Sequence, residues 1–357
     1  MKTVKYLTFG ILMIIAVACK KDLPGNPAEN GGQQPPAPPP AMSHPGSLGF
    51  LGDTTDVSPT VTGGLVLMGG GSDVSAAFRW MIDKSGGGNA VIIRSTGTNA
   101  YNSYVNGLGN LKSVETLLIN SRDLANNDQV ARVIKNAELL FIAGGDQSDY
   151  MNYWRGTKMA DAINYLLTTK KAPVGGTSAG CAILGKIYYS GENGSVTSDE
   201  ALPNPYRSTI TLYKNDFLNA PFMNDVITDQ HFLTRNRQGR LTVFLARSLQ
   251  DWNIAAKGIA ADEGTAVCVD QNGKAVVYGS SNAYFLKTDI SKKPEKCQPG
   301  LPLDFINDNK SVMVYQIRGS TVGNGSFSVS DFNAEKASGG VWSWWSVTNG
   351  VLNQISF

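Results

Sequence analysis

The chain has 357 residues, of which 42% are hydrophobic and 17% are charged. This is the composition of an ordinary globular protein that is long enough to bury a sizeable core. The formal net charge is +2, and Lys2 and Lys5 supply two of the positive charges near the start. A nearly neutral remainder without a long basic run argues against nucleic acid as a partner.

The first 19 residues have the pattern of an export signal. "MKTVKYLTFGILMIIAVAC" combines two lysines, an apolar run and small residues before Cys19. The run is shorter than the roughly 20 residues that a membrane-spanning helix needs. "AVAC" resembles a bacterial lipoprotein signal, although Ala16 stands where Leu is commoner. The resemblance implies a lipidated Cys19 and an exported, membrane-anchored protein, periplasmic or at the cell surface. A plain secretory signal cut near Ala18 is the alternative.

The amino-acid composition changes along the rest of the chain and indicates where its segments begin and end. Residues 20–47 are rich in Pro, Gly and polar residues and lack apolar periodicity, which is typical of an extended linker. We therefore expect a signal peptide at 1–18, a tether at 19–47, an α/β domain at 48–290 and a β-rich section of unassigned role at 291–357. The three cysteines beyond Cys19 cannot all pair, so a disulfide scaffold is excluded. A bridge between Cys268 and Cys297 and unpaired core thiols both remain open.

Short apolar runs alternate with helical patterns between residues 60 and 185. Strands are expected within 63–71, 89–95, 114–120, 138–147 and 171–176, and helices within 72–88, 126–137, 150–170 and from 178 onward. Such alternation predicts a mainly parallel sheet with helices on both faces, whose ligand site lies beyond the carboxyl ends of the strands. Three glycine turns are expected there, at Gly69–Gly71, Gly144–Gly145 and Gly175–Gly176.

The later part of the chain is predicted to continue with a strand within 219–232 and a helix within 240–252. Strands joined by tight turns are expected over 255–287, where "QNG" is a hairpin signal.

The stretch "GTSAG" at 176–180 fits the pattern G-x-S-x-G. Small neighbours allow a sharp strand-to-helix turn that exposes the hydroxyl of Ser178, and the amides of the following helix can stabilise an oxyanion. A glycine-rich turn without catalytic meaning is the plainer interpretation. The preceding apolar "APVG" and the following "AGCAILG" supply the context that a nucleophile requires.

Histidine is scarce: the chain has only His44, in the Pro-rich stretch, and His231. A Ser–His mechanism would therefore have to use His231 as its base. A structural histidine is the alternative, but polar and basic residues crowd the same short segment. They are Asp229, Gln230, Arg235, Arg237 and Arg240. The same scarcity argues against a histidine-rich zinc site.

A carboxylate should hold the imidazole tautomer and raise the imidazole pKa. "GIAADEGTAVCVD" places Asp262 and Glu263 at the end of an apolar strand. The chain order is then Ser, His, acid, whereas an α/β-hydrolase runs Ser, acid, His and brings an HGGG-type loop that is missing here.

Five stretches in this order resemble the cyanophycinase and peptidase E family of serine peptidases, whose fold is similar to flavodoxin-like, class I glutamine amidotransferase domains. They are "GGGSD", "FIAGGDQ", "GGTSAG", "TDQHFLTRNRQGRL" and "GIAADEGTA", and they span about residues 63–270. Their combination is typical of the cyanophycinase branch. The resemblance implies Ser178 as nucleophile, His231 as base and Glu263 as the third member.

The resemblance also implies a substrate groove and a substrate class. The residues implied to line the groove are Gln147, Asp229, Gln230, Arg235, Arg237 and Arg240. The family cleaves peptide bonds involving aspartate, and its cyanophycinase branch cleaves β-aspartyl-arginine units. We expect an oxyanion hole formed by the amides of Ala179 and of Gly144 or Gly145, with no metal or organic cofactor.

Two other functions remain open: a binding protein without turnover on the same fold, and an esterase or amidase without aspartyl preference. The natural substrate, whether cyanophycin or short isoaspartyl peptides, and the oligomeric state, a homodimer included, are also left open by the sequence.

Overall fold

The computed structural model of the protein describes residues 44–356. The expected signal peptide, the lipidation site at Cys19 and the tether as far as residue 43 lie outside the described residues. None of the helices in the described range has the length and apolar character needed to cross a bilayer.

The first sheet contains the parallel strands that the alternating pattern predicts. Its nine strands have the order β1-β4-β3-β5-β6-β2-β11-β12-β15. The parallel strands are β2 (Gly64–Met68), β3 (Asn89–Arg94), β4 (Ser113–Leu118), β5 (Leu139–Ile142) and β6 (Pro173–Thr177). The antiparallel strands are β1 (Ser47–Gly52), β11 (Thr265–Asp270), β12 (Lys274–Gly279) and β15 (Asn324–Ser328). The fold class is therefore α/β.

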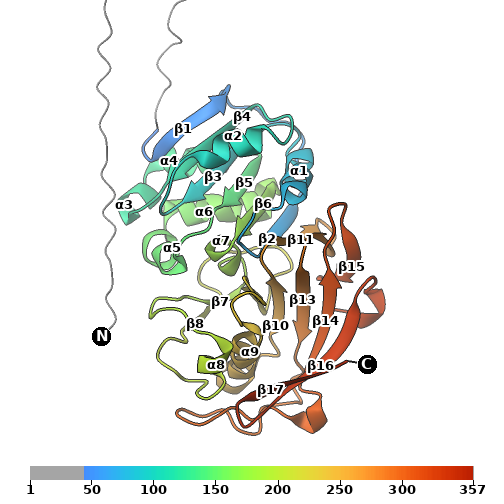
Figure 1. Ribbon diagram of the computed structural model, residues 1–357. Helices are drawn as coiled ribbons and strands as arrows, with labels where there is room; N and C mark the ends of the chain where they lie inside the picture. The colour runs from blue at the N-terminus through green and yellow to red at the C-terminus, as the bar shows by residue number, and fades with distance from the viewer. Residues whose placement is uncertain (1–43, 357) are drawn as a thin grey trace, which may run out of the picture. The chain divides into compact units, whose positions relative to one another are not determined.

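Helices cover both faces of the parallel strands (Figure 1). One face carries α1 (Ser75–Lys84) and α2 (Ala100–Asn106), and the other carries α4 (Asp128–Asn136), α5 (Gln147–Trp154) and α6 (Lys158–Tyr165). Successive side chains of a strand point to opposite faces. Leu65 and Leu67 of β2 accordingly pack in one core, and Val66 and Met68 pack in the other. This two-sided burial explains why the strands are apolar throughout.

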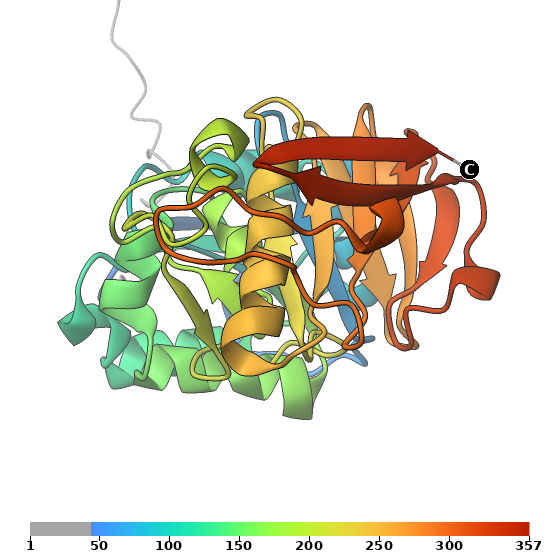
Figure 2. The ribbon, with the colours of Figure 1, turned by 90° about the horizontal axis from the view of Figure 1, so that it is seen from below.

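A second sheet of eight strands has the order β17-β16-β14-β13-β10-β9-β7-β8. Its strands are β7 (Ile187–Tyr189), β8 (Leu212–Lys214), β9 (Val226–Asp229), β10 (Lys257–Ala261), β13 (Asn282–Lys287), β14 (Val312–Arg318), β16 (Val341–Thr348) and β17 (Val351–Ser356). Strands β7, β9 and β10 are parallel, and the others pair antiparallel. Helix α9 (Gln238–Trp252) lies over this sheet (Figure 2) and shares its core.

The β-rich section after residue 291 is present, and its strands are distributed between both sheets. Strands β14, β16 and β17 extend the second sheet, whereas β15 pairs with β12 at the end of the first. Phe327 of β15 stacks on Phe285 of β13 with ring centroids 4.1 Å apart, so the two sheets share a core at this end.

Two helix predictions were wrong in extent. The single helix expected within 150–170 is divided into α5 and α6, followed by a π-helical turn at Leu166–Lys170. The break occurs because Gly156 adopts φ +68° and the Thr157 hydroxyl caps α6 by accepting the Ala160 amide. The helix expected after Ser178 ends within four residues, as α7 (Ala179–Ala182). Two other short helices are α3 (Arg122–Ala125) and α8 (Ser198–Ala201).

Gly175 and Gly176 were expected in a turn, but they lie inside β6. A Cβ at Gly175 would lie 2.8 Å from Met81 Sδ of α1, and a Cβ at Gly176 would lie 2.4 Å from the Gly180 backbone of α7. The glycine pair therefore lets both helices pack directly against the strand that leads to Ser178.

The three cysteines of the folded part are buried free thiols: Cys181, Cys268 and Cys297. No bridge joins Cys268 to Cys297.

Candidate active site

Ser178 occupies a sharp turn between β6 and α7. Its backbone has φ 52° and ψ −119°, a conformation that costs a non-glycine residue free energy. The Ser178 amide donates to the Met68 carbonyl at the end of β2, over 3.1 Å. The strained turn is therefore held by the neighbouring strand, as the G-x-S-x-G pattern requires of an exposed nucleophile.

His231 follows the carboxyl end of β9 in the second sheet, and its backbone is also left-handed, with φ 48°. Its amide donates to the Gly69 carbonyl over 2.7 Å. Gly70 lies against the imidazole, because a Cβ at Gly70 would be 2.3 Å from His231 Cε1. The glycine turn after β2 is thus the surface on which the ring rests, and His231 Nε2 lies 2.7 Å from Ser178 Oγ.

Glu263 follows β10 and completes a chain of hydrogen bonds. Its Oε1 accepts a hydrogen bond from His231 Nδ1 over 2.5 Å. This fixes the tautomer: the proton on Nδ1 faces Glu263, and Nε2 presents its lone pair to the Ser178 hydroxyl. Asp262 does not contact the imidazole nitrogens; its carboxylate accepts from backbone amides and hydroxyls instead.

Burial sets the protonation of His231. The residue is 4% exposed, and desolvation of the charged imidazolium lowers the pKa of His231 below its ordinary value. The hydrogen bond to Glu263 acts in the opposite direction, whereas the charges of Arg235 and Arg237 lower the pKa further. The carboxylate thus raises the imidazole pKa as expected, but burial and the two arginines outweigh it. The imidazole of His231 is therefore neutral at pH 7.

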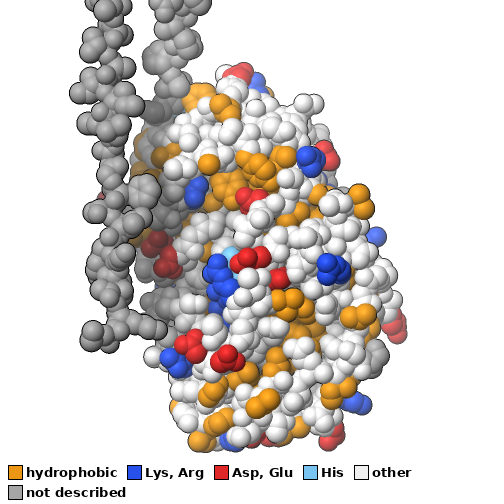
Figure 3. Space-filling view, viewed as in Figure 1, with side chains coloured by type: hydrophobic (Ala, Val, Ile, Leu, Met, Phe, Trp, Pro, Cys, Tyr) orange, Lys and Arg blue, Asp and Glu red, His pale blue; other side chains and the backbone are white. Residues whose placement is uncertain are grey.

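A groove of about 270 Å³ opens beside Ser178. Besides the serine, its lining comprises Gly145, Asp146, Gln147, Tyr189, Gly191, Gly194, Ser195, Gln230, Arg235, Arg237 and Arg240. Five of the six residues expected to line a groove are thus brought together. In Figure 3 a histidine side chain reaches the surface between basic and acidic side chains near the middle of the face.

The sixth residue, Asp229, is bound to Arg240. Both side chains are 2% exposed, and Arg240 holds the carboxylate in a bidentate manner through Nε at 3.0 Å and Nη2 at 2.5 Å. Arg240 Nη1 donates to the Val196 carbonyl over 3.1 Å. All three guanidinium nitrogens are therefore engaged within the protein at the base of the groove, and the pair supports the strand end that leads to His231.

Arg235 and Arg237 differ from Arg240 in their exposure. The Arg235 side chain is 54% exposed, with Nε 3.7 Å from Glu263 Oε1. Arg237 is 7% exposed and donates through Nη1 to the backbone carbonyl and the side chain of Gln230. Burial lowers the pKa of Arg237 to about 10, with the charge of Arg240 acting in the same direction. The guanidinium stays charged at pH 7, so it presents a desolvated cation to the groove.

The residues expected to form an oxyanion hole lie close to Ser178. A Cβ at Gly144 would be 3.2 Å from Ser178 Cβ and 3.8 Å from its Oγ, so the β5 turn passes directly beside Ser178. Gly145 lines the groove, and Ala179 begins α7.

The sequence interpretation missed one wall of the groove. Tyr189 ends β7, and the Gly191–Ser195 segment follows it. Gln147 Nε2 donates to the Tyr189 carbonyl over 2.6 Å, which ties this wall to α5. The run "SGENGS" at 190–195 is typical of a turn. Its position beside Ser178, however, depends on the pairing of β7 with β8 and β9, which lie later in the chain.

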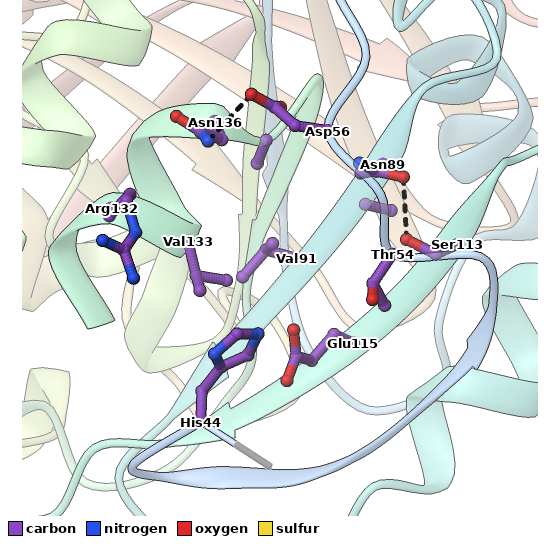
Figure 4. Close-up of a pocket in the computed structure, with 12 residues that line it drawn as sticks. His44, Thr54, Asp56, Asn89, Val91, Ser113, Glu115, Arg132, Val133 and Asn136 are labelled. Atoms are coloured by element: carbon purple, nitrogen blue, oxygen red, sulfur yellow. Dashed lines mark hydrogen bonds between the residues drawn. The ribbon is translucent and has the colours of Figure 1, made fainter. Parts of the chain in front are cut away.

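A second cavity lies away from the groove beside Ser178, at the amino ends of β3 and β4 (Figure 4). His44, Glu115 and Arg132 line it, and Asn136 donates to Asp56 there over 3.1 Å. His44 lines this cavity and not the groove beside Ser178, which leaves His231 as the histidine beside the serine.

Comparison with known proteins places this geometry in a family context. A model of peptidase family S51 matches residues 99–277, a range that contains Ser178, His231 and Glu263. The cyanophycinase of Trichormus variabilis is 28% identical over 171 residues, which are 48% of this chain and 52% of the relative. The cyanophycinase of Synechococcus elongatus is 28% identical over 169 residues, 47% and 48% of the two chains. The chain thus spans about half the length of the curated relatives it matches.

Solved structures give more distant likenesses. A peptidase from an acI-B1 Actinobacterium aligns with a TM-score of 0.47 and 16% identity, over 73% of this chain and 96% of the other. A putative peptidase E protein from Listeria monocytogenes aligns with a TM-score of 0.36 and 15% identity, over 62% and 100% of the two chains.

Proposed function

The chain belongs to peptidase family S51, and on that premise we propose that it is a serine peptidase acting at aspartyl residues through Ser178, His231 and Glu263. The observation that carries the proposal is one continuous path of hydrogen bonds. Ser178 Oγ lies 2.7 Å from His231 Nε2, and His231 Nδ1 lies 2.5 Å from Glu263 Oε1. A nucleophile, a neutral base and an orienting carboxylate are the groups that acyl transfer needs.

In the proposed acylation step, Ser178 Oγ attacks the carbonyl carbon of the scissile bond while its proton passes to His231 Nε2. The imidazolium that forms is stabilised by Glu263. His231 then gives the proton to the leaving amine as the carbon–nitrogen bond breaks, which leaves an ester on Ser178. The amides of Ala179 and of Gly144 or Gly145 are proposed to bind the developing oxyanion.

Deacylation repeats the sequence with water. His231 Nε2 takes a proton from the attacking water, the ester bond to Ser178 breaks, and the proton returns to Oγ. The acid product leaves with the new carboxyl group, and the enzyme is restored. Every proton transfer uses His231, whose lowered pKa keeps it neutral at the start of each cycle.

We propose that Arg235 and Arg237 bind the substrate's acidic group. Both line the groove beside Ser178, and neither is committed to a bidentate carboxylate inside the protein. Arg240 is excluded from this role because it is paired with the buried Asp229. A planar guanidinium matches a carboxylate, which supports an aspartyl or β-aspartyl substrate such as a β-Asp-Arg unit or an isoaspartyl peptide.

The proposal is tested by incubating the purified protein with cyanophycin, β-Asp-Arg, β-Asp-Leu and an α-aspartyl peptide, followed by product analysis. Ser178→Ala is the matched control. We expect cleavage of at least one β-aspartyl substrate by the wild type and none by the variant. Equal cleavage of simple esters and amides would point to a hydrolase without aspartyl preference. Failure of a fluorophosphonate probe to label Ser178, together with no turnover, would point to a binding protein.

For the location of the protein we propose export and lipid attachment at Cys19. The support is compositional: "AVAC" resembles a lipoprotein signal and a Pro-rich run follows it. Mass spectrometry of the protein purified from its membrane fraction tests this. A diacylglyceryl mass on Cys19 is expected, and an unmodified N-terminus downstream of Cys19 would contradict the proposal.

A further inference from the structure

Two neighbouring carboxylates, those of Asp262 and Glu263, form hydrogen bonds to different parts of the segment that contains His231. Glu263 contacts the imidazole of His231, as described above. Asp262 is 6% exposed and turns toward the backbone that follows His231. Because both follow β10 directly, the ring and the backbone of the base are attached to one point of the second sheet.

The Asp262 carboxylate accepts four hydrogen bonds, three of them from the turn that follows His231. Its Oδ1 accepts the Leu233 amide at 3.0 Å, the Thr234 amide at 3.0 Å and the Thr234 hydroxyl at 2.9 Å. Its Oδ2 accepts the Ser281 hydroxyl at 2.9 Å, just before β13. These hydrogen bonds outweigh burial and keep the pKa of Asp262 below its ordinary value, so the group is ionised at pH 7.

The turn that Asp262 holds begins with an unfavourable backbone conformation. His231 has φ 48°, and a left-handed backbone at a non-glycine residue persists only where the surroundings impose it. The Gly69 carbonyl fixes the amide of His231 on one side over 2.7 Å, and the Gly264 amide fixes the Gly70 carbonyl over 3.0 Å. A Cβ at Gly69 would lie 2.0 Å from the Asp262 carbonyl oxygen, so these segments are in direct backbone contact.

We propose that Asp262 is a positioning residue for the base: its carboxylate holds the turn at residues 232–234 so that the His231 imidazole lies between Ser178 Oγ and Glu263. This deepens the proposed function and rests on it. The carboxylate touches neither the reacting atoms nor the ring. It acts through the backbone, and losing it should let the imidazole move away from both partners. Displacement of a catalytic group by about 1 Å can lower turnover by about 10²-fold.

The test compares Asp262→Ala with a matched variant, Asp270→Ala. Asp270 also accepts two backbone amides, those of Asn272 and Lys274, but it does so in the β11–β12 turn, at the opposite end of β11 from Glu263. We expect Asp262→Ala to lower kcat by about 10- to 100-fold with KM nearly unchanged, and Asp270→Ala to leave kcat within twofold. Asp262→Asn keeps the shape and one neutral acceptor, so its kcat should fall between Asp262→Ala and the wild type.

A spectroscopic measurement separates positioning from stability and needs no substrate. The proton on His231 Nδ1 should give a strongly downfield NMR signal because of its short hydrogen bond to Glu263. Only two histidines are present in the chain, so His44→Gln assigns the signal. Asp262→Ala should abolish or shift it, whereas Asp270→Ala should preserve it.

An unchanged signal with kcat within twofold of the Asp270→Ala variant would overturn the positioning role. If Asp262→Ala does not fold, the same criteria apply to Asp262→Asn. Failure of the proposed peptidase function would give a different result: neither the wild type nor any variant would cleave an aspartyl substrate, regardless of the NMR signal.

Discussion

Glu263 Oε1 lies 2.5 Å from His231 Nδ1, and the same oxygen lies 3.7 Å from Arg235 Nε. The carboxylate favours the imidazolium, whereas the guanidinium disfavours it. Burial has the largest effect on the pKa of His231 and lowers it; the neighbouring cations lower it further, whereas the anion raises it. Removing the anion should therefore move the pH profile of kcat/KM to lower pH, and removing a cation should move it to higher pH.

Glu263→Gln should lower kcat by about 10²- to 10⁴-fold, because the amide can no longer stabilise the imidazolium or enforce the tautomer. His231 must be neutral to act as base, so kcat/KM rises with pH through the His231 pKa of the free enzyme. That pKa already lies below about 6.5. Loss of the anion lowers it further, so the acid limb should move to lower pH. A kcat/KM profile checks this, and an unmoved limb with nearly full turnover would exclude Glu263 as the partner.

Arg235→Gln should move the same limb to higher pH. The variant removes a positive charge that opposes protonation of His231, so the His231 pKa rises. KM for an acidic substrate should rise at the same time, because Arg235 is proposed to bind the substrate carboxylate. Arg132→Gln, in the cavity of Figure 4, is the matched control and should change neither quantity. A limb that moves to lower pH in Arg235→Gln would contradict this account of the electrostatics.

Ser178→Ala should fold normally and lose about 10⁶-fold in kcat, since removal of the nucleophile leaves only residual catalysis from binding and the oxyanion hole. Ser195→Ala removes another hydroxyl from the same groove and should keep kcat within tenfold. Steady-state rates and fluorophosphonate labelling measure both. Activity of Ser178→Ala within tenfold of wild type would show that the nucleophile lies elsewhere.

Gly70→Ala should displace the base. A Cβ there would lie 2.3 Å from His231 Cε1, and the φ of +90° is unfavourable for alanine. We expect turnover to fall at least about 10²-fold. Gly156→Ala is a control for backbone strain alone, because Gly156 has φ +68° and no atom within 4 Å of the added Cβ. Equal activity of the two variants would mean that the imidazole does not rest on Gly70.

Arg240→Met should destabilise the fold, because it leaves the carboxylate of Asp229 buried without its partner. Breaking a buried ion pair in this way costs about 3–5 kcal/mol. Lys158→Met breaks a pair with Asp128 in which the side chains are 54% and 85% exposed, and such pairs contribute only about 0–1 kcal/mol. Urea unfolding measures the difference, and similar midpoints for the two variants would assign Arg240 a role other than support.

Local sequence patterns were sufficient to predict the parallel strands and the turn at Ser178. Two-sided burial requires continuous apolar runs, and the glycines at 176 and 180 remove the side chains that would block a sharp strand-to-helix turn. The scarcity of histidine pointed to His231 without any geometry. The break between α5 and α6 at residues 155–157 was missed because helical periodicity continues across it, and the left-handed backbone of Gly156 and the cap at Thr157 separate the two helices.

The sequence by itself thus predicted the α/β fold class, from alternating apolar runs and helical patterns, and it indicated Ser178 and His231 as candidates, from a local motif and from the scarcity of histidine. Only the tertiary structure decided that Glu263, and not Asp262, contacts the imidazole. It also decided that Arg240 is paired with Asp229, whereas Arg235 and Arg237 are available to a ligand in the groove. These choices depend on the direction in which a side chain leaves a strand end. That direction follows from the pairing of β10 with β9 and β13, between residues that lie 22 to 31 positions apart in the chain. Asp262 directly follows the last residue of β10, whereas Glu263 already lies in the turn that leads to β11, so two neighbouring carboxylates of the same charge acquire different partners.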